Sequence, residues 1–301
     1  MLDRVRDWLE PPLRDARIVF IHVAKCGGTS LVRGMADCFK PWRSTQRGSV
    51  VELREGALRA AAAAARIEHG EARRALLAYH LATTNARLVA GHYRYSRAVY
   101  EHYRGDWSFV TMLRHPVSRW YSNFYFNATR PPDDQFHIAL PIEDFVETER
   151  ASLLGTELVR SFADLDDERE AVSDEAVRRA IENLRGFTLV GTLEDLPSFT
   201  DAFERSFGHA LDVPRLNVTS ARRQPPAEVA PGVAERVREL CWPDLEVYRS
   251  FFPSIGGQGN RMSMTLRRVY PALPPPSTSS ISPSSGTAMT ASLTGYESVP
   301  G

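Results

Sequence analysis

The sequence has very little lysine. Its only lysines are Lys25 and Lys40, so arginine supplies nearly all of the positive charge, a bias that we take as a sign of a GC-rich bacterial genome. The formal net charge of the 301-residue chain is +0. A chain without excess positive charge is not expected to bind nucleic acid as a polyelectrolyte, so any affinity for anions must be local.

Cysteine is also scarce. It occurs three times, at Cys26, Cys38 and Cys241, without a close CxxC pair, which argues against a disulfide scaffold or a zinc knuckle. Long apolar runs are missing as well. Residues 1–16 mix charged and apolar side chains and indicate neither a signal peptide nor a membrane span. We therefore expect a cytoplasmic protein without a membrane span.

Short apolar runs alternate with helical patterns along the chain. Buried strands are predicted at residues 17–23, 87–91, 107–113 and 187–191. Helices are predicted at residues 31–39, across 50–81 with one or two breaks, after Pro116, and at 174–184, 194–207, 227–240 and 244–251. This alternation predicts an α/β fold, with a central parallel sheet and helices on both faces.

The sequence predicts three parts. Residues 1–16 form an N-terminal extension, and residues 17–262 form one α/β domain. Residues 263–301 are rich in Pro, Ser, Thr and Gly, a composition typical of a disordered tail.

A glycine pair follows the first predicted strand, in the stretch AKCGGTS at residues 24–30. Where a strand turns into a helix, backbone N–H groups at the positive helix end favour a phosphate, and glycines let the backbone approach closely. Lys25 adds a mobile charge, and hydroxyls follow at Thr29 and Ser30. The alternative is a plain strand–helix turn. Lys25 precedes Gly27 and Gly28, whereas a Walker A loop has lysine after its last glycine.

A second candidate for anion binding follows the third predicted strand. Arg114 ends that strand, and Ser122 lies eight residues further on. If a helix begins near Pro116, Ser122 falls close to two turns later, and both side chains could reach one phosphate. The alternative is that Arg114 only ends the strand and that Ser122 faces solvent.

Four stretches together resemble the sulfotransferase superfamily, and within it the family that includes heparan sulfate 2-O-sulfotransferase. They are IHVAKCGGTSL, VAGHYRYS, TMLRHPVSRWYSNFYF and FTLVGTLEDLPSF, and the resemblance extends from about residue 17 to about residue 252. It implies a P-loop NTPase-like (sulfotransferase) three-layer sandwich over residues 17–262. Cys26 stands where the family more often has threonine, and His115 stands where it more often has aspartate.

The resemblance also implies a co-substrate, 3′-phosphoadenosine 5′-phosphosulfate (PAPS), and roles for single residues. The residues implied to bind its 5′-phosphosulfate are Lys25, Cys26, Gly27, Gly28, Thr29 and Ser30. Arg114 and Ser122 are implied to bind the 3′-phosphate. Arg222 or Thr219 is implied to add a phosphate contact, and the alternative is that both belong to an ordinary solvated basic turn. His92 is implied to be the general base, and Lys25 should stabilise the leaving phosphate. His22, inside an apolar strand, is expected to be a structural residue.

The implied reaction is transfer of a sulfuryl group from PAPS to a hydroxyl by in-line displacement. We expect a carbohydrate acceptor, with a small hydroxylated metabolite as an alternative. No acidic cluster has metal-ligand spacing, so no metal is expected. Two other readings remain open, a nucleotide kinase or NTPase-like phosphotransferase and a non-catalytic binding protein. Tyr93, Arg94 and Tyr95 either line an acceptor cleft or pack in the core.

Overall fold

A computed structural model describes residue 13 and residues 16–39, 50–82, 86–214 and 230–253. All of these residues belong to one unit, Met1–Val269. The predicted N-terminal extension lies almost entirely outside the described residues, and the predicted tail lies entirely outside them.

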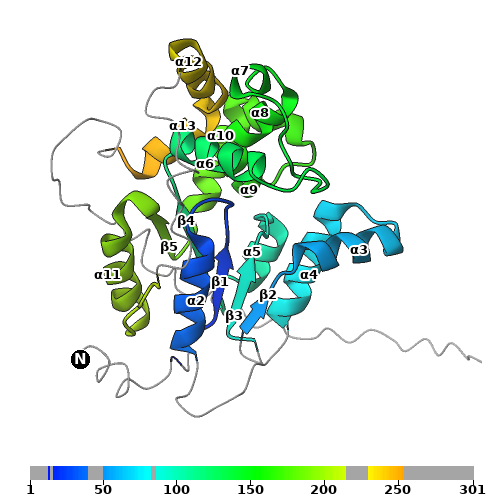
Figure 1. Cartoon of the computed structure of the whole chain (residues 1–301). Coiled ribbons are helices and arrows are strands. Elements are labelled where there is room, and N and C mark those ends of the chain that lie inside the picture. Colours follow the sequence, from blue (N-terminus) through cyan, green and yellow to red (C-terminus); the bar gives the residue numbers. More distant parts are fainter. Residues whose placement is uncertain (1–12, 14–15, 40–49, 83–85, 215–229, 254–301) are drawn as a thin grey trace, which may run out of the picture. The chain divides into compact units, whose positions relative to one another are not determined.

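Five parallel strands form the centre of this unit, in the order β2-β3-β1-β4-β5 (Figure 1). They are β1 (Ile18–Ile21), β2 (Val50–Glu52), β3 (Leu88–Gly91), β4 (Ser108–Leu113) and β5 (Leu189–Thr192). The three central strands are apolar and almost completely buried, as expected of parallel strands that are covered on both faces. The predicted α/β class, with a parallel sheet flanked by helices, is confirmed.

Helices make up most of the remaining described chain. Before β4 they are α2 (Gly28–Cys38), α3 (Glu55–Ala65), α4 (His69–Ala82) and α5 (Arg97–Tyr103). Between β4 and β5 they are α6 (Pro116–Ala128), α7 (Ile142–Phe145), α8 (Glu149–Gly155), α9 (Glu157–Phe162), η2 (Glu168–Val172) and α10 (Asp174–Arg185). After β5 they are η3 (Leu193–Asp195), α11 (Leu196–Phe207), α12 (Pro231–Leu240) and α13 (Trp242–Phe251).

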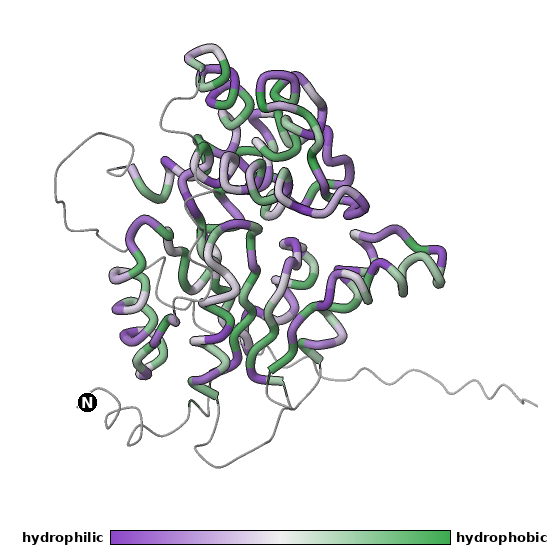
Figure 2. The backbone as a smooth tube through the Cα atoms, viewed as in Figure 1, coloured by the Kyte–Doolittle hydropathy of each residue, from purple (hydrophilic) through white to green (hydrophobic). Residues whose placement is uncertain are grey.

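Side-chain contacts define two groups of helices around the sheet. Helix α2 lies against the segment that follows α11, where the Cys38 thiol donates to the main-chain oxygen of Ala210 at 3.8 Å. In the second group, the Tyr103 hydroxyl of α5 donates to Ala78 of α4 at 3.3 Å, and Tyr100 donates to Gly186, directly after α10, at 2.5 Å. Figure 2 shows apolar strands at the centre and helices that mix hydrophilic and hydrophobic residues around them.

A second, smaller core lies among the helices above the sheet in Figure 1. It is built from α6, α7, α8, α12 and α13, and the rings of Trp120 and Phe124 stack within it. Because α6 starts just after β4 ends, this helical layer lies on the side of the sheet where the strands have their carboxyl ends. In parallel α/β sheets that side carries the ligand site.

An ion pair is buried inside this helical layer. Arg119 and Asp244 are both fully buried, and their charged groups lie 3.9 Å apart. The Asp244 carboxylate accepts hydrogen bonds from the backbone N–H groups of Leu158 and Val159, at 2.9 and 3.0 Å. Burial raises the pKa of Asp244 to about 7, although the nearby Arg119 charge opposes this shift.

Replacing Arg119 by methionine should lower the free energy of unfolding by about 3–5 kcal/mol, because it leaves the Asp244 carboxylate without its cation in the protein interior. Chemical denaturation measures this change. Arg178→Met is the control, since the ion pairs of Arg178 lie at the surface, where screening by solvent leaves them with little effect on stability. Equal losses in the two variants would contradict a special role for the buried pair.

One sequence prediction is wrong. Residues 50–81 were expected to be helical, but Val50–Glu52 forms β2, at the edge of the sheet. The strand is stabilised by pairing with β3, and the N–H of Leu53 continues this pairing by donating to Ala90 at 2.9 Å. A strand of three residues is too short for its apolar alternation to be recognised beside a long helical pattern.

Candidate functional site

The turn between β1 and α2 has the backbone of an anion-binding loop. Lys25 and Gly27 both have positive φ angles, 68° and 75°, and a lysine in this conformation is uncommon. Within the described residues, the N–H groups of Gly27, Gly28 and Thr29 donate no hydrogen bond. Helix α2 starts here and is 11 residues long, so its positive end reinforces these donors. The turn can therefore receive a phosphate.

Gly28 is required for a different reason from Gly27. A Cβ atom at residue 28 would lie 1.9 Å from Cδ2 of His22, well inside van der Waals contact. Only glycine allows the imidazole of His22 to lie against the start of α2. In this pair, Gly27 provides the left-handed backbone conformation, and Gly28 provides the space that the His22 ring occupies.

Gly28→Ala should therefore lower the free energy of unfolding by about 1–3 kcal/mol, the usual cost of overpacking a filled interior. Thermal and chemical denaturation measure it. Gly56→Ala is the matched control, because nothing lies within 4 Å of a Cβ there and the helix position favours alanine by up to about 1 kcal/mol. A Gly28→Ala protein as stable as the wild type would show that the His22 ring moves aside without cost.

Cys26 turns its side chain away from this loop surface. Its thiol is completely buried, and its N–H donates to the carbonyl of Val23 at 3.3 Å. Burial raises the pKa of the thiol to about 12, so it stays protonated. Thr29 is exposed and Ser30 is partly exposed, so their hydroxyls remain at the loop surface. Cysteine in place of threonine at residue 26 therefore affects the packing of the core and not the surface of the loop.

Lys25 is held near α6 by an aromatic ring. Its ammonium lies 3.7 Å from the ring centroid of Phe126, a cation–π contact. Ser122 lies one helical turn before Phe126 on α6, and residues four apart share a helix face. Ser122 therefore lies on the face of α6 that borders the β1–α2 turn. No hydrogen bond between Ser122 and Arg114 is formed in the described structure.

Arg114 joins the two segments that were predicted to bind anions. It follows β4 by one residue, and its Nη1 donates to the main-chain oxygen of Lys25 at 3.3 Å. Arg114 forms no ion pair with any residue that the structure describes, so its charge remains available to an anion. The structure thus brings Arg114 to the turn that contains Lys25.

A carboxylate fixes the start of α6. Glu194 accepts the N–H of His115 at 3.0 Å, and it also accepts hydrogen bonds from Thr192 at 2.5 Å and Tyr248 at 3.2 Å. The ring of His115 lies edge-on to Tyr248, with centroids 5.5 Å apart. Burial lowers the pKa of His115, an effect that Glu194 partly offsets. His115 therefore packs locally and keeps Arg114 in place.

His92 reaches the same edge of the sheet through strand register. Ile21 pairs with Gly91 in parallel register, so His22 and His92 follow side by side. Nδ1 of His92 lies 2.7 Å from the carbonyl oxygen of His22. A carbonyl can only accept, so Nδ1 carries the proton and Nε2 keeps its lone pair. Among the described residues Nε2 has no hydrogen-bond partner. This tautomer suits a general base.

The residues after His92 have different roles. Tyr93 and Tyr95 are buried, and burial raises the pKa of both hydroxyls. Both side chains belong to the main core, so they pack there and do not line an acceptor cleft. Arg94 stays partly exposed and forms an ion pair with Glu168, which also pairs with Arg160.

The described chain brings Lys25, Arg114 and His92 to one edge of the sheet, and Ser122 faces the same turn. Thr219 and Arg222 lie outside the described residues. Sequence reasoning missed Phe126. The available signal was its spacing of four residues from Ser122 in a predicted helix, which indicates a shared face.

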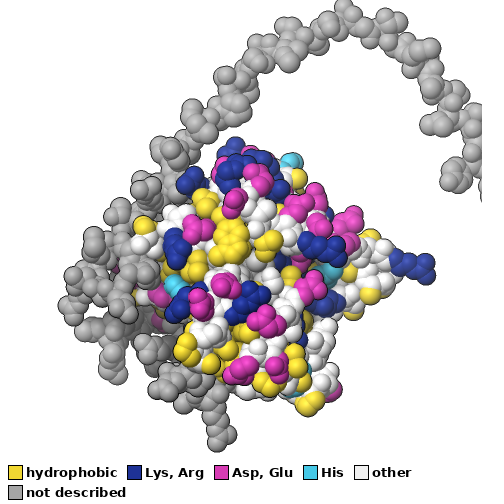
Figure 3. Space-filling model, turned by 90° about the horizontal axis from the view of Figure 1, so that it is seen from above, with side chains coloured by type: hydrophobic (Ala, Val, Ile, Leu, Met, Phe, Trp, Pro, Cys, Tyr) yellow, Lys and Arg dark blue, Asp and Glu magenta, His cyan; other side chains and the backbone are white. Residues whose placement is uncertain are grey.

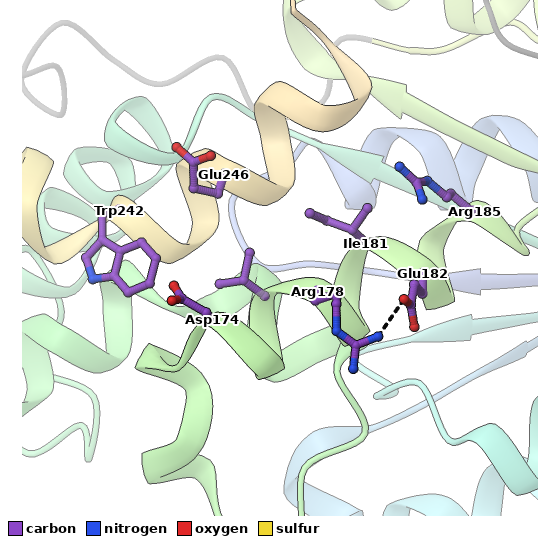
Figure 4. A pocket seen from close by; sticks show the side chains of 8 residues that line it. Asp174, Arg178, Ile181, Glu182, Arg185, Trp242 and Glu246 are labelled. Atoms are coloured by element: carbon purple, nitrogen blue, oxygen red, sulfur yellow. Dashed lines mark hydrogen bonds and ion pairs between the residues drawn. The ribbon is translucent and has the colours of Figure 1, made fainter.

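A separate hollow lies between α10 and α13 (Figure 4), with a volume of about 330 Å³. The residues that line it are Asp174, Val177, Arg178, Ile181, Glu182, Arg185, Trp242 and Glu246. The charges there pair locally, since Arg178 bonds to both Glu182 and Glu175. None of the predicted site residues lines this hollow, so it does not belong to the candidate site.

The helical face seen from above carries basic and acidic side chains in mixture (Figure 3). No helix within the described ranges is both long and apolar enough to cross a membrane. In the part of the chain that the structure describes, no group of three or more His, Cys, Asp or Glu side chains could hold a metal ion.

Comparison with known proteins gives no match: neither protein-family models nor curated proteins match this chain.

Proposed function

We propose that this protein is a PAPS-dependent sulfotransferase, which transfers a sulfuryl group to a hydroxyl, and that its sheet and helices form the P-loop NTPase-like sandwich of that superfamily. One observation carries the proposal. Segments that follow three adjacent strands, β3, β1 and β4, are hydrogen-bonded to one another through His92, His22, Lys25 and Arg114. Separate structural residues would have no reason to meet in this way.

The β1–α2 turn supports binding of the 5′-phosphosulfate. It offers N–H groups at a helix start, the ammonium of Lys25 and the hydroxyls of Thr29 and Ser30. Arg114 and Ser122, on either side of the start of α6, are the candidates for the 3′-phosphate. PAPS supplies the sulfuryl group that is transferred, and it leaves as adenosine 3′,5′-bisphosphate.

His92 and Lys25 divide the chemistry between them. An alcohol is a weak nucleophile at neutral pH, so a base must accept its proton, and the lone pair on Nε2 of His92 can do so. Negative charge then develops on the leaving phosphate oxygen, where the Lys25 ammonium neutralises it. Both groups are held in place before the substrate binds, His92 by the His22 carbonyl and Lys25 by Phe126.

A carbohydrate is the acceptor implied by the resemblance of the four stretches to the family that includes heparan sulfate 2-O-sulfotransferase. Incubation with labelled PAPS and a panel of sugars, lipids and phenols tests this choice. Transfer to a sugar hydroxyl supports it. Transfer only to small phenols or other metabolites would support sulfuryl transfer but would contradict a carbohydrate acceptor.

Adenosine 3′,5′-bisphosphate should bind more tightly than adenosine 5′-monophosphate by about 1.5–3 kcal/mol, the range for hydrogen bonds to a charged group. Titration calorimetry in the presence of a metal chelator measures both affinities. In Arg114→Ala this preference should shrink, because the guanidinium that favours the 3′-phosphate is lost. Arg178→Ala, on α10 and outside the candidate site, serves as the control and should retain the preference.

Equal affinity for the two nucleotides in the wild-type protein would refute the PAPS site. Tighter binding of ATP than of the bisphosphate, in a metal-dependent manner, would favour the phosphotransferase alternative. Donor binding without transfer to any acceptor would favour a non-catalytic protein.

A further inference from the structure

His22 contacts His92 in two independent ways. Its main-chain oxygen accepts the Nδ1–H of His92 at 2.7 Å, and its imidazole stacks on the imidazole of His92. The ring centroids are 4.3 Å apart, and the ring planes differ by 25°. The hydrogen bond fixes the tautomer of His92, whereas the stacking restricts rotation of its ring. One residue therefore controls both the proton position and the orientation of the proposed base.

The ring of His22 is also in contact with the β1–α2 turn, called the phosphate loop below. A Cβ atom on Gly28 would lie 1.9 Å from Cδ2 and 2.0 Å from Nε2 of His22. The imidazole thus lies against the first residue of α2 and also stacks on His92. This arrangement links the loop expected to bind the donor to the base expected to act on the acceptor.

The charge state of His22 suits this place. Burial, with a smaller contribution from the neighbouring His92, lowers the pKa of His22 to about 3. His22 therefore presents a neutral aromatic ring to His92 at any pH near neutrality. When His92 takes up a proton it becomes a cation, and a neutral ring stacked on it attracts that cation, whereas a charged ring would repel it.

We propose that His22 is a positioning residue, whose stacked ring holds His92 in its reactive orientation against the phosphate loop. The expected effect of His22 on turnover rests on the proposed transferase function. The effect of His22 on the orientation and tautomer of His92 does not depend on the reaction and can be measured in the free protein.

Two variants separate the ring from its nitrogens. His22→Ala keeps the main-chain carbonyl but removes the stacked ring, and His22→Phe restores a flat ring without nitrogens. We expect His22→Ala to lower kcat by about 10- to 100-fold, the scale for a small misplacement of a catalytic group. The affinity for adenosine 3′,5′-bisphosphate should change less than about threefold, because the loop N–H groups are untouched. His22→Phe should recover most of the lost turnover.

Nuclear magnetic resonance provides a readout that does not depend on activity. Long-range ¹H–¹⁵N spectra report the tautomer of each imidazole, and a His92→Gln protein identifies the His92 signals among the eight histidines. The wild type should show the Nδ1–H tautomer of His92, with ring protons shifted by the stacked ring. His22→Ala should lose that shift, and His22→Phe should keep one.

Each outcome decides. His92 signals and turnover unchanged in His22→Ala would overturn the positioning role, as would a His22→Phe protein as slow as His22→Ala. Thermal denaturation verifies that the variants are folded; if His22→Ala does not fold, the comparison of His22→Phe with the wild type decides. Altered His92 signals in His22→Ala, together with a wild type that transfers no sulfuryl group, would refute the proposed function while supporting the positioning role.

Discussion

His92→Ala should lower kcat by about 10²–10⁴-fold, the range for removal of a general base. The loss follows from the geometry, since Nε2 of His92 is the nitrogen with a lone pair at the sheet edge where Lys25 and Arg114 also lie. Steady-state kinetics with PAPS and an acceptor measures it. Turnover of the wild type should also rise with pH, because a base must be unprotonated to accept the hydroxyl proton.

The matched control for this variant is His102→Ala. His102 is exposed on α5, and its removal should leave turnover unchanged. Binding of adenosine 3′,5′-bisphosphate should barely change in His92→Ala, because the base acts on the acceptor. A His92→Ala protein that turns over at the wild-type rate would show that another residue acts as the base.

Lys25→Ala should lower kcat by about 10²–10³-fold, the scale for losing one preorganised group that stabilises developing charge. The binding of the product nucleotide should fall much less, because the N–H groups of the loop remain. Single-turnover kinetics separates the two effects. Lys25→Arg retains the positive charge but not the compact ammonium, so it should recover part of the rate.

An unchanged kcat in Lys25→Ala would show that the lysine only shapes the turn. Its φ of 68° makes that outcome worth testing directly, with Lys25→Gly. Glycine adopts this conformation without strain, so the Lys25→Gly protein should be at least as stable as the Lys25→Ala protein. Its turnover should be as low as that of Lys25→Ala.

Much of the fold could be predicted from the sequence, because its strands are long enough and apolar enough to be recognised. Ser108–Leu113 is a clear example, with an apolar run that stops at Arg114. The three residues of β2 could not be recognised, because their strand conformation depends on pairing with β3. Helix starts near prolines were also predictable, since α6 begins at Pro116.

From the sequence, the candidate site was predictable only as a group of residues that follow strand ends. Lys25, His92 and Arg114 all follow strands, and parallel strands bring such residues to one edge. The contacts among them depend on register and on helix rotation, which the sequence does not specify. His22 was expected to be a structural residue because it lies inside the apolar predicted strand at residues 17–23. Its stacking on His92 emerges only from the register of Ile21 with Gly91.

The strand order has a consequence for folding. β1 lies between β3 and β4, and its last residue, Ile21, pairs with Gly91 on one side and Thr111 on the other. These are contacts between distant parts of the chain, which form late because long loops must close first. Lys25, His92 and Arg114 come together only after both pairings exist. A chain that is still emerging from the ribosome therefore cannot assemble the candidate site until the whole of β4 is available to join the sheet.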